Sequence, residues 1–461
     1  MKKIFSMLAL GALMVASSCS NFVDGLDESP NNPSGVTNGL LLSASQLGTF
    51  TAFTGQLARL TSVLTQHSAG TDFQLEDIAN YVILEGNNVN EWETIYTKCI
   101  VNENQLIEQA GETDPYYRGI AKIMKAMALG LATDLWGDVP SQEASLGING
   151  EDNFNPAYDA QAAVIQDVQT LLDEGIADLS KDVTANVNLP GADDFIHGGD
   201  VDAWIKTAWL LKARYANRIS KRDSESAAKV LQYLANAGMT GVEDDAMAIF
   251  GPNGNENNQW YAFHQNRGGY MMMGEFFIEM LKAQNDPRLP MIATQTTAGE
   301  YVGTPLGSVD NSTSITGPYY ASPTSAAPLA TYVEAKFLEA EASLRSGDVD
   351  NAASAFNEAV ITHIEKVTGE EAPSEFVDAI ASEDGASITL KKIMEQKYVA
   401  MFTQIESYSD WRRTGFPELT PNPGGSVAGI PRRLPTPSVE RLYNTSAVVT
   451  SDILKPVWWD E

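Results

Sequence analysis

Apolar residues recur every three or four positions along most of this chain, which is the periodicity of amphipathic α-helices. Each run places its apolar residues on one face of a helix. We therefore predict a mainly α-helical protein with few strands. The four clearest runs extend over residues 120–135, 164–179, 204–219 and 390–405.

The segment 331–366 predicts two short helices that meet at a tight turn. Its two apolar stripes are separated by Gly347 and Asp348, and small alanines stand where the two backbones would approach each other. This arrangement resembles a tetratricopeptide repeat. One such pair cannot bury its apolar face alone, so further pairs must stack against it. Because the spacing is irregular, we expect a degenerate array that includes helices near 118–136, 160–180 and 201–237.

Four long segments interrupt the helical pattern and are rich in glycine, asparagine, proline, threonine and aromatic residues. Loops of this length in a compact domain usually carry function, and binding residues tend to lie on loops held by a rigid scaffold. We expect the irregular loops to form a ligand-binding lobe on a single domain of residues 35–461. The segments are residues 149–158, 184–199, 250–273 and 295–324.

The N-terminus predicts a secreted, lipid-anchored protein. Lys2 and Lys3 precede an apolar run at 4–15, which is shorter than the roughly 20 residues that span a bilayer and fits a signal peptide. The small residues 16–18 then precede Cys19, a pattern that resembles the lipobox of bacterial lipoproteins. We therefore expect a signal peptide over residues 1–18 and a lipid on Cys19. The alternative is an ordinary cleavage site beside an incidental cysteine.

The segment after Cys19 predicts a flexible tether up to residue 34. Its sequence, SNFVDGLDESPNNPS, is too polar and acidic to bury enough apolar surface to become ordered. No later stretch is long and apolar enough to span a membrane, so the lipid is the only predicted membrane contact. Cys99 is the one remaining thiol, which excludes an intrachain disulfide, and its helical setting beside Trp92 predicts a buried, inert side chain.

Charge and motifs restrict the function further. Thirty basic and 60 acidic residues give a net charge of −30, which repels nucleic acid and anionic lipid. The four histidines are scattered, and no zinc-hydrolase, serine-hydrolase or phosphate-binding motif occurs. We therefore expect no nucleic-acid partner, no cofactor and no catalytic residue. A pair of catalytic carboxylates needs no local motif, so a surface hydrolase stays open as an alternative.

Several short segments, in order along almost the whole chain, resemble the SusD/RagB family of outer-membrane lipoproteins. The first half contains DLWGDVP at 134–140, Pro156-x-Tyr158-Asp159-x-Gln161, and Trp204 with LKARY at 211–215. The second half contains Asp286-Pro287-Arg288, EQK at 395–397, YSDWRRTG at 408–415, IPRRL at 430–434, Pro437 with Glu440 and Asn444, and Trp458-Trp459.

The resemblance implies a function as well as a fold. It implies a cell-surface lipoprotein that captures an oligosaccharide or a peptide. It also implies a partner, a SusC-like TonB-dependent transporter of the outer membrane. This protein would cover the transporter as a lid and deliver the ligand to it. No enzymatic activity is implied. A tetratricopeptide-type adaptor that binds only protein is a further alternative, and it would use the concave helical face rather than the aromatic loops.

Most residues of these motifs have a structural interpretation. Trp136, Trp204 and Trp209 lie on helical stripes and predict core packing. The arginines at 412–413 and 432–433 stand near Asp410 and Glu440, which suits ion pairs that fasten C-terminal loops to the repeats. We expect Trp458 and Trp459 to seal the C-terminus against the body.

Candidate ligand contacts come from three loops that combine aromatic rings with polar groups. Sugar recognition needs aromatic faces for the apolar ring surfaces and amides, carboxylates or guanidinium groups for the hydroxyls. The alternative for each ring is burial against the body. The candidates are Asp72, Phe73 and Gln74 after Gly70; Trp260, Tyr261 and Arg267, with His264 and Asn266 beside them; and Tyr319 and Tyr320.

Overall fold

The computed structural model describes residues 35–461. The predicted signal peptide 1–18, the lipidated Cys19 and the tether up to residue 34 lie outside the described residues. Within residues 35–461, helices dominate and strands are few, which confirms the predicted fold class. No helix in this part of the chain is long and apolar enough to cross a membrane.

The first half of the described chain is almost wholly helical. Asp200 caps α9 by accepting hydrogen bonds from the backbone N–H groups of Asp202 and Ala203, and Gly238 ends α10 in the left-handed conformation. The helices are α2 (Asn38–Thr54), α3 (Gln56–Leu64), α4 (Phe73–Ala79), α5 (Val89–Glu93), the π-helix η2 (Thr94–Ile100), α6 (Val101–Ala110), α7 (Pro115–Trp136), α8 (Gln161–Leu179), α9 (Val201–Arg218) and α10 (Ser226–Ala237).

The second half contains shorter helices, and its two strands pair with strands of the first half in two small antiparallel ribbons. Strand β1 (Ser68–Gly70) pairs with β3 (Met271–Met273), and β2 (Ala246–Ala248) pairs with β4 (Ala327–Ala330). The helices are α11 (Gln259–Asn266), α12 (Glu275–Ala283), α13 (Leu289–Ile292), α14 (Tyr332–Ser346), α15 (Val349–Thr368), α16 (Ser374–Ile380), α17 (Leu390–Ala400), α18 (Glu406–Thr414) and α19 (Ser438–Tyr443).

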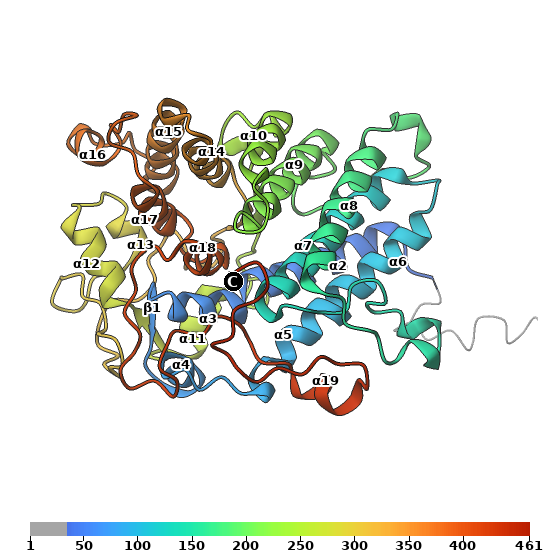
Figure 1. Cartoon of the computed structure of the whole chain (residues 1–461), viewed down its shortest axis with the longest axis horizontal. Helices are drawn as coiled ribbons and strands as arrows, with labels where there is room; N and C mark the ends of the chain where they lie inside the picture. Colours follow the sequence, from blue (N-terminus) through green and yellow to red (C-terminus); the bar gives the residue numbers. More distant parts are fainter. Residues whose placement is uncertain (1–34) are drawn as a thin grey trace, which may run out of the picture.

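Three antiparallel helix pairs form the repeat array. Helix α7 packs on α8, α9 on α10, and α14 on α15, while α8 also contacts α9 and α10 contacts α14. Figure 1 shows these helices side by side along one edge of the molecule. The predicted stacking of degenerate helix pairs is therefore confirmed. The turn of the 14/15 pair is the predicted one, because Gly347 adopts a φ of 84° and Asp348 caps α15.

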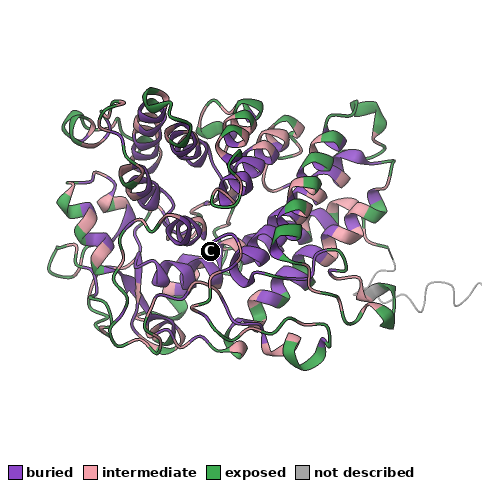
Figure 2. Cartoon of the chain, in the orientation of Figure 1, coloured by how far each residue is buried: buried purple, intermediate pink, exposed green. Residues whose placement is uncertain are grey.

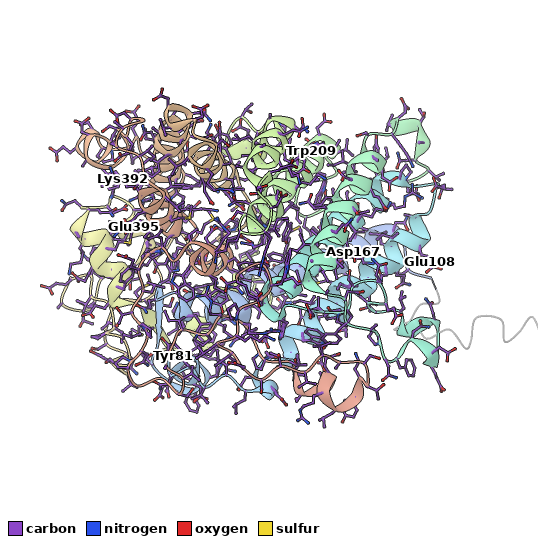
Figure 3. The ribbon with its side chains drawn as sticks, viewed as in Figure 1. Tyr81, Glu108, Asp167, Trp209, Lys392 and Glu395 are labelled. Carbon is purple, nitrogen blue, oxygen red and sulfur yellow. The ribbon has the colours of Figure 1, made fainter. Side chains whose placement is uncertain are left out.

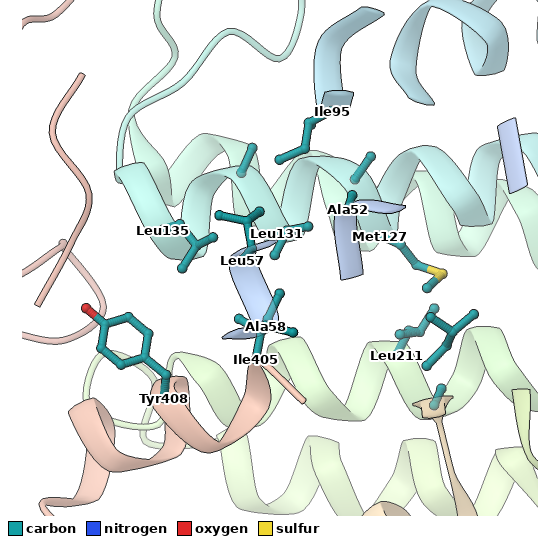
Figure 4. Packing of buried hydrophobic residues seen from close by; sticks show 14 of the residues in the cluster. Ala52, Leu57, Ala58, Ile95, Met127, Leu131, Leu135, Leu211, Ile405 and Tyr408 are labelled. Carbon is teal, nitrogen blue, oxygen red and sulfur yellow. The ribbon is translucent and has the colours of Figure 1, made fainter. Parts of the chain in front are cut away.

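Two hydrophobic clusters fill the space between the elements. The larger one joins α2, α3, α7, α9 and α18, and Figure 4 shows Leu57, Leu131, Leu211 and Ile405 converging there. The smaller one lies between α14, α15 and α17. Figure 2 shows the inward helix faces buried and the loops and outer faces exposed. The repeats thus form a rigid scaffold for the segments around α4 and α11.

Two sequence-based boundaries are wrong. The segment 250–273 is not one loop, because it contains α11 and β3. The run 390–405 is not one helix. It ends as α17 at Ala400, and Thr403, with a φ of 69°, turns the chain into α18. In both cases the apolar side chains pack into the core, and this tertiary packing sets helix boundaries that the local apolar spacing does not show.

The motif residues are mostly structural, as expected. Trp136, Trp204 and Trp459 are buried, and so is Cys99, whose thiol pKa is raised by burial. Trp209 is only half-buried and packs on Tyr233 of α10.

The C-terminal arginines fasten the loops differently from the expectation. Arg413 pairs with Asp410, as expected, and also with Glu341. Arg432 pairs with Asp460, whereas Arg412 and Arg433 donate to backbone carbonyls. The expected pairing of these arginines with Glu440 is wrong. The carboxylate of Glu440 accepts from three uncharged side chains, those of Trp92, Tyr158 and Asn444.

Candidate ligand-binding site

A pair of aromatic rings, one exposed and one half-buried, lies where the β1–β3 ribbon ends. In this ribbon Gly70 stands opposite Met271, and the Thr71 N–H donates to the carbonyl of Tyr270 over 3.0 Å. The pairing brings Phe73, at the start of α4, to the ring of Tyr270. The two rings are stacked with centroids 4.9 Å apart and planes 18° from parallel. Two segments almost 200 residues apart thus form one aromatic surface.

The backbone at Phe73 presents its ring to solvent. Asp72 caps α4 by accepting from the Phe73 N–H over 2.9 Å, and Phe73 itself adopts a φ of 45°. This left-handed conformation is costly for a residue with a side chain, and such residues are enriched at functional sites. The ring remains 63% exposed. Gln74 is half-buried beside it.

Arg267 completes this surface from the C-terminal end of α11. Its guanidinium carbon lies 5.7 Å from the centroid of the Tyr270 ring, within the range of a cation–π contact, and its side chain is exposed. We call Phe73, Tyr270 and Arg267 the aromatic platform. Sequence analysis had singled out Phe73 and Arg267 but missed Tyr270, although Gly268 and Gly269 before it mark the close turn that presents the ring.

An open groove of about 810 Å³ continues from Arg267. It lies between α2, α11 and the segment 249–257. Its walls combine aromatic rings with side-chain amides and two arginines. The residues that matter here are Phe50, Phe250, Phe263, Asn255, Asn257, Gln259, Asn266, Arg59 and Arg267, with Glu256 as the carboxylate. Arg267 belongs to both the platform and the groove, so the two form one continuous surface.

Trp260 is not part of this surface, and its predicted place on an exposed loop is wrong. Asn258 caps α11 with hydrogen bonds from the N–H groups of Trp260 and Tyr261, which turns Trp260 inward. Its side chain is 1% exposed, and its indole N–H donates to the Thr54 carbonyl over 3.1 Å. The ring packs edge-on against Phe402. Tyr261 follows on the same helix and is half-buried.

Tyr320 is also buried and therefore leaves the set of candidate ligand contacts. It is 5% exposed, packs edge-on against Phe402 and lies 3.4 Å from the His363 ring nitrogen. Tyr319 is half-buried against it, and burial raises the pKa of Tyr319 to about 12. Both tyrosines line a small cavity with His363 and Lys366 of α15. The third predicted loop thus belongs mainly to the core.

His264 holds the groove wall rather than projecting into it. Its ring nitrogen Nε2 is 3.0 Å from the Thr316 hydroxyl. Burial, with a smaller contribution from Arg59, lowers its pKa to about 4. The ring is therefore neutral at physiological pH. Asn266, two residues further along α11, is exposed and lines the groove.

A second cavity of about 700 Å³ lies between α12, α17 and β1. Figure 3 labels Tyr81 and Glu395, which come from opposite ends of the chain and both line it. Glu275, Glu279 and Glu395 are its carboxylates, and no lysine or arginine of the described residues lines it. The two cavities therefore differ in the sign of their charge.

Fold and site together define a helical-repeat protein whose loops carry an open aromatic surface. A family model described as "SusD-like_2: Starch-binding associating with outer membrane" matches residues 30–437. The chain therefore belongs to the SusD-like family, which confirms the resemblance read from its motifs. None of the curated protein sequences matches the chain.

Solved structures share the fold over nearly their whole length. A SusD/RagB family protein from Bacteroides thetaiotaomicron is 25% identical, with a TM-score of 0.76, covering 92% of this chain and 99% of its own. A SusD homolog from Bacteroides fragilis is 21% identical, with a TM-score of 0.74 and 92% and 100% coverage. A chitin-binding SusD homolog from Flavobacterium johnsoniae is 19% identical, with a TM-score of 0.78 and 91% and 98% coverage.

Proposed function

We propose that this protein is a lipid-anchored, cell-surface binding protein that captures an oligosaccharide, or a peptide, without altering it. The captured ligand passes to a SusC-like TonB-dependent transporter that the protein covers as a lid. The observation that carries the binding function is the aromatic platform of Phe73, Tyr270 and Arg267 beside an open groove. The description of the family and the chitin-binding relative favour a saccharide over a peptide.

The chemistry of the platform suits a sugar chain. The C–H face of a pyranose ring is apolar and stacks on an aromatic ring, while its hydroxyls need hydrogen-bonding partners. Phe73 offers the exposed ring, and the groove offers the amides of Asn255, Asn257 and Asn266. A volume of about 810 Å³ lies within the range of about 300–1,000 Å³ that small-ligand sites occupy.

The platform is tested by Phe73→Ala. The exposed ring supports no core contact, so the variant keeps its stability but loses oligosaccharide affinity about ten- to hundredfold, equivalent to about 1–3 kcal/mol for one large ring. Isothermal titration of the purified protein in detergent against a panel of neutral and acidic oligosaccharides measures this. Tyr443→Ala is the matched control, because Tyr443 is 77% exposed on α19, away from the groove. Equal affinity of both variants would remove the platform from the binding site.

The transporter partnership is tested separately. A tagged copy of this protein, extracted with mild detergent from its own outer membrane, should co-purify with a TonB-dependent transporter. Purification of the protein alone, under conditions that preserve other membrane complexes, would contradict the lid role while leaving ligand capture in place.

A further inference from the structure

Buried arginines in this protein face carboxylates or, as Arg412 does, donate short hydrogen bonds to backbone carbonyls. With 60 acidic and 30 basic residues, carboxylate partners are abundant. A buried guanidinium without a partner is costly, because its lost hydration is not replaced. The pairs of the repeat region follow this rule and include Arg214 with Glu334, Arg218 with Asp134, Arg288 with Asp286, and Arg413 with Glu341.

Arg59 of α3 departs from this rule. Its side chain is only 8% exposed, yet its Nε atom has no hydrogen-bond partner. The two terminal nitrogens make only long contacts of 3.4 Å, to the Gln259 carbonyl and to Gln56 Oε1. The guanidinium lies 4.5 Å from the centroid of the Phe263 ring, on the wall of the groove. Its donors are thus poorly satisfied at a place that a ligand can reach.

The nearest charges do not supply the missing partner. Among residues 35–461, no carboxylate forms an ion pair with Arg59 or Arg267. Glu91 attracts Arg59 from a greater distance, and Arg267 repels it. Burial lowers the pKa of Arg59 to about 10, so the group stays positive at neutral pH. Glu91 acts on Arg59 more strongly than Arg267 does, and neither arginine has a carboxylate of the described residues at ion-pair distance.

The groove carries two positive groups on a protein whose net charge is negative. Glu256, the carboxylate that lines it, already accepts from the Asn253 amide over 2.7 Å. The protein as a whole carries a charge of −30, and the second cavity holds three carboxylates without a cation. An anion in the groove would accept from the unpartnered Nε of Arg59 and would lie near the second guanidinium group, that of Arg267. Hydrogen bonds between a guanidinium group and an anion are stronger than hydrogen bonds between two uncharged groups.

We propose that the groove binds a negatively charged group, a carboxylate or a sulfate ester, of an acidic oligosaccharide whose neighbouring ring stacks on the aromatic platform. The inference rests on the proposed function and narrows its substrate class. Arg59 supplies buried donors at the bottom of the site, and Arg267 joins the anion to the sugar ring on the platform. The stacking surface and the groove amides favour an acidic glycan over an acidic peptide.

The experiment compares four kinds of probe on the purified full-length protein in detergent: oligogalacturonates, chondroitin sulfate oligosaccharides, neutral chito-oligosaccharides of equal length, and acidic peptides. One acidic oligosaccharide class should bind at least about tenfold more tightly than the neutral one. Arg267→Ala should remove this advantage, a loss of about tenfold, as expected for one charge-assisted hydrogen bond, and added salt should weaken it. Binding of oligogalacturonates shows that a carboxylate suffices. Chondroitin sulfate carries both a carboxylate and a sulfate ester, so binding that is lost when this probe is desulfated shows that the sulfate is required.

Two variants complete the test. Arg59→Met keeps an apolar stem against Phe263 and should also lose the preference for acidic over neutral oligosaccharides. If Arg59→Met does not fold, the result for Arg267→Ala, a change at an exposed position, tests the inference alone. Arg441→Ala on α19 is the control and should bind like the unaltered protein. Equal binding of neutral and acidic sugars, or an Arg267-dependent preference for acidic peptides, overturns this inference and leaves ligand capture standing. Failure of every probe to bind overturns the proposed function itself.

Discussion

Phe73 and Trp260 are both large aromatic residues of the segments that surround the groove, and their surroundings give them opposite roles. Phe73 is 63% exposed because Asp72 starts α4 and holds the following residue in a left-handed turn. Trp260 is 1% exposed because Asn258 starts α11 and directs it toward Phe402. The capping residue of each segment sets the direction of the ring, and the contacts that the ring then meets decide whether it is buried.

Trp260→Ala should destabilise the protein without a specific loss of ligand affinity. Removing a fully buried indole leaves a cavity and an unpaired Thr54 carbonyl, which together cost roughly 3–5 kcal/mol. Thermal unfolding should show a clearly lower midpoint, and titration well below that temperature should give an affinity close to that of the unaltered protein. Phe73→Ala should give the reverse pair of results. A normal midpoint with lost affinity for Trp260→Ala would contradict the structure here.

At the scale of elements, helix pairing buries some ionisable groups without full partners. Glu103 of α6 is completely buried against α2, where Ser45 donates to its Oε1 atom over 3.1 Å, and its Oε2 atom has no partner. Burial raises the pKa of Glu103 to about 8, with smaller opposing effects of Ser45 and Lys125. The α2–α6 contact thus favours the protonated carboxyl.

Glu103→Gln should therefore stabilise the protein more at pH 8 than at pH 5. The raised folded-state pKa means that the folded protein binds the proton more tightly than the unfolded chain. Stability from this group is present below about pH 4.5 and is lost as the pH rises toward 8. The uncharged amide of Glu103→Gln does not lose this stability. The free energy of unfolding of the variant, relative to that of the unaltered protein, should therefore rise by roughly 1 kcal/mol or more between pH 5 and pH 8.

Urea unfolding of both proteins at the two pH values measures this difference. The matched control is Glu108→Gln, because Glu108 is exposed on the same helix and lies at the outer edge in Figure 3. A difference between Glu103→Gln and the unaltered protein that stays constant with pH would show that Glu103 is not held protonated.

At the scale of the whole molecule, the repeats, the loops and the proposed anchor have separate roles in folding, ligand binding and membrane attachment. The stacked pairs from α7 to α15 pack together over hydrophobic clusters. The platform and groove are built from α2, α3, α4 and α11, where segments distant in sequence meet. The proposed ligand site thus lies on helix ends and connecting segments, where binding residues of proteins often lie.

Cys19→Ala should release the protein from the membrane while leaving its fold intact. The change removes the proposed lipid, and residues 35–461 contain no helix that could replace it as an anchor. Fractionation of cells should place the variant in the soluble fraction, with a circular dichroism spectrum like that of the unaltered protein. Continued fractionation with the outer membrane would contradict the lipoprotein assignment.

The sequence alone determined the long helices of the repeats, their stacking in pairs and the family. Apolar spacing is a local property, and each stripe around Leu131, Leu211 or Phe337 needs only a facing helix to be buried. The turn at Gly347 is equally local, because only its own backbone conformation is required. Phe73 and Arg267 were identifiable because exposed polar and aromatic residues stood together in short segments.

Only the tertiary structure decided the site itself. Tyr270 reaches Phe73 through a ribbon between segments almost 200 residues apart, and no local pattern specifies that register. Trp260 and Tyr320 became core residues because Phe402, far along the chain, packs against both. Whether Arg59 finds a carboxylate depends on every neighbour that folding brings to it. The burial of a side chain and its choice of ion-pair or hydrogen-bond partner depend on contacts with residues distant in sequence. They are therefore fixed only when the chain is folded.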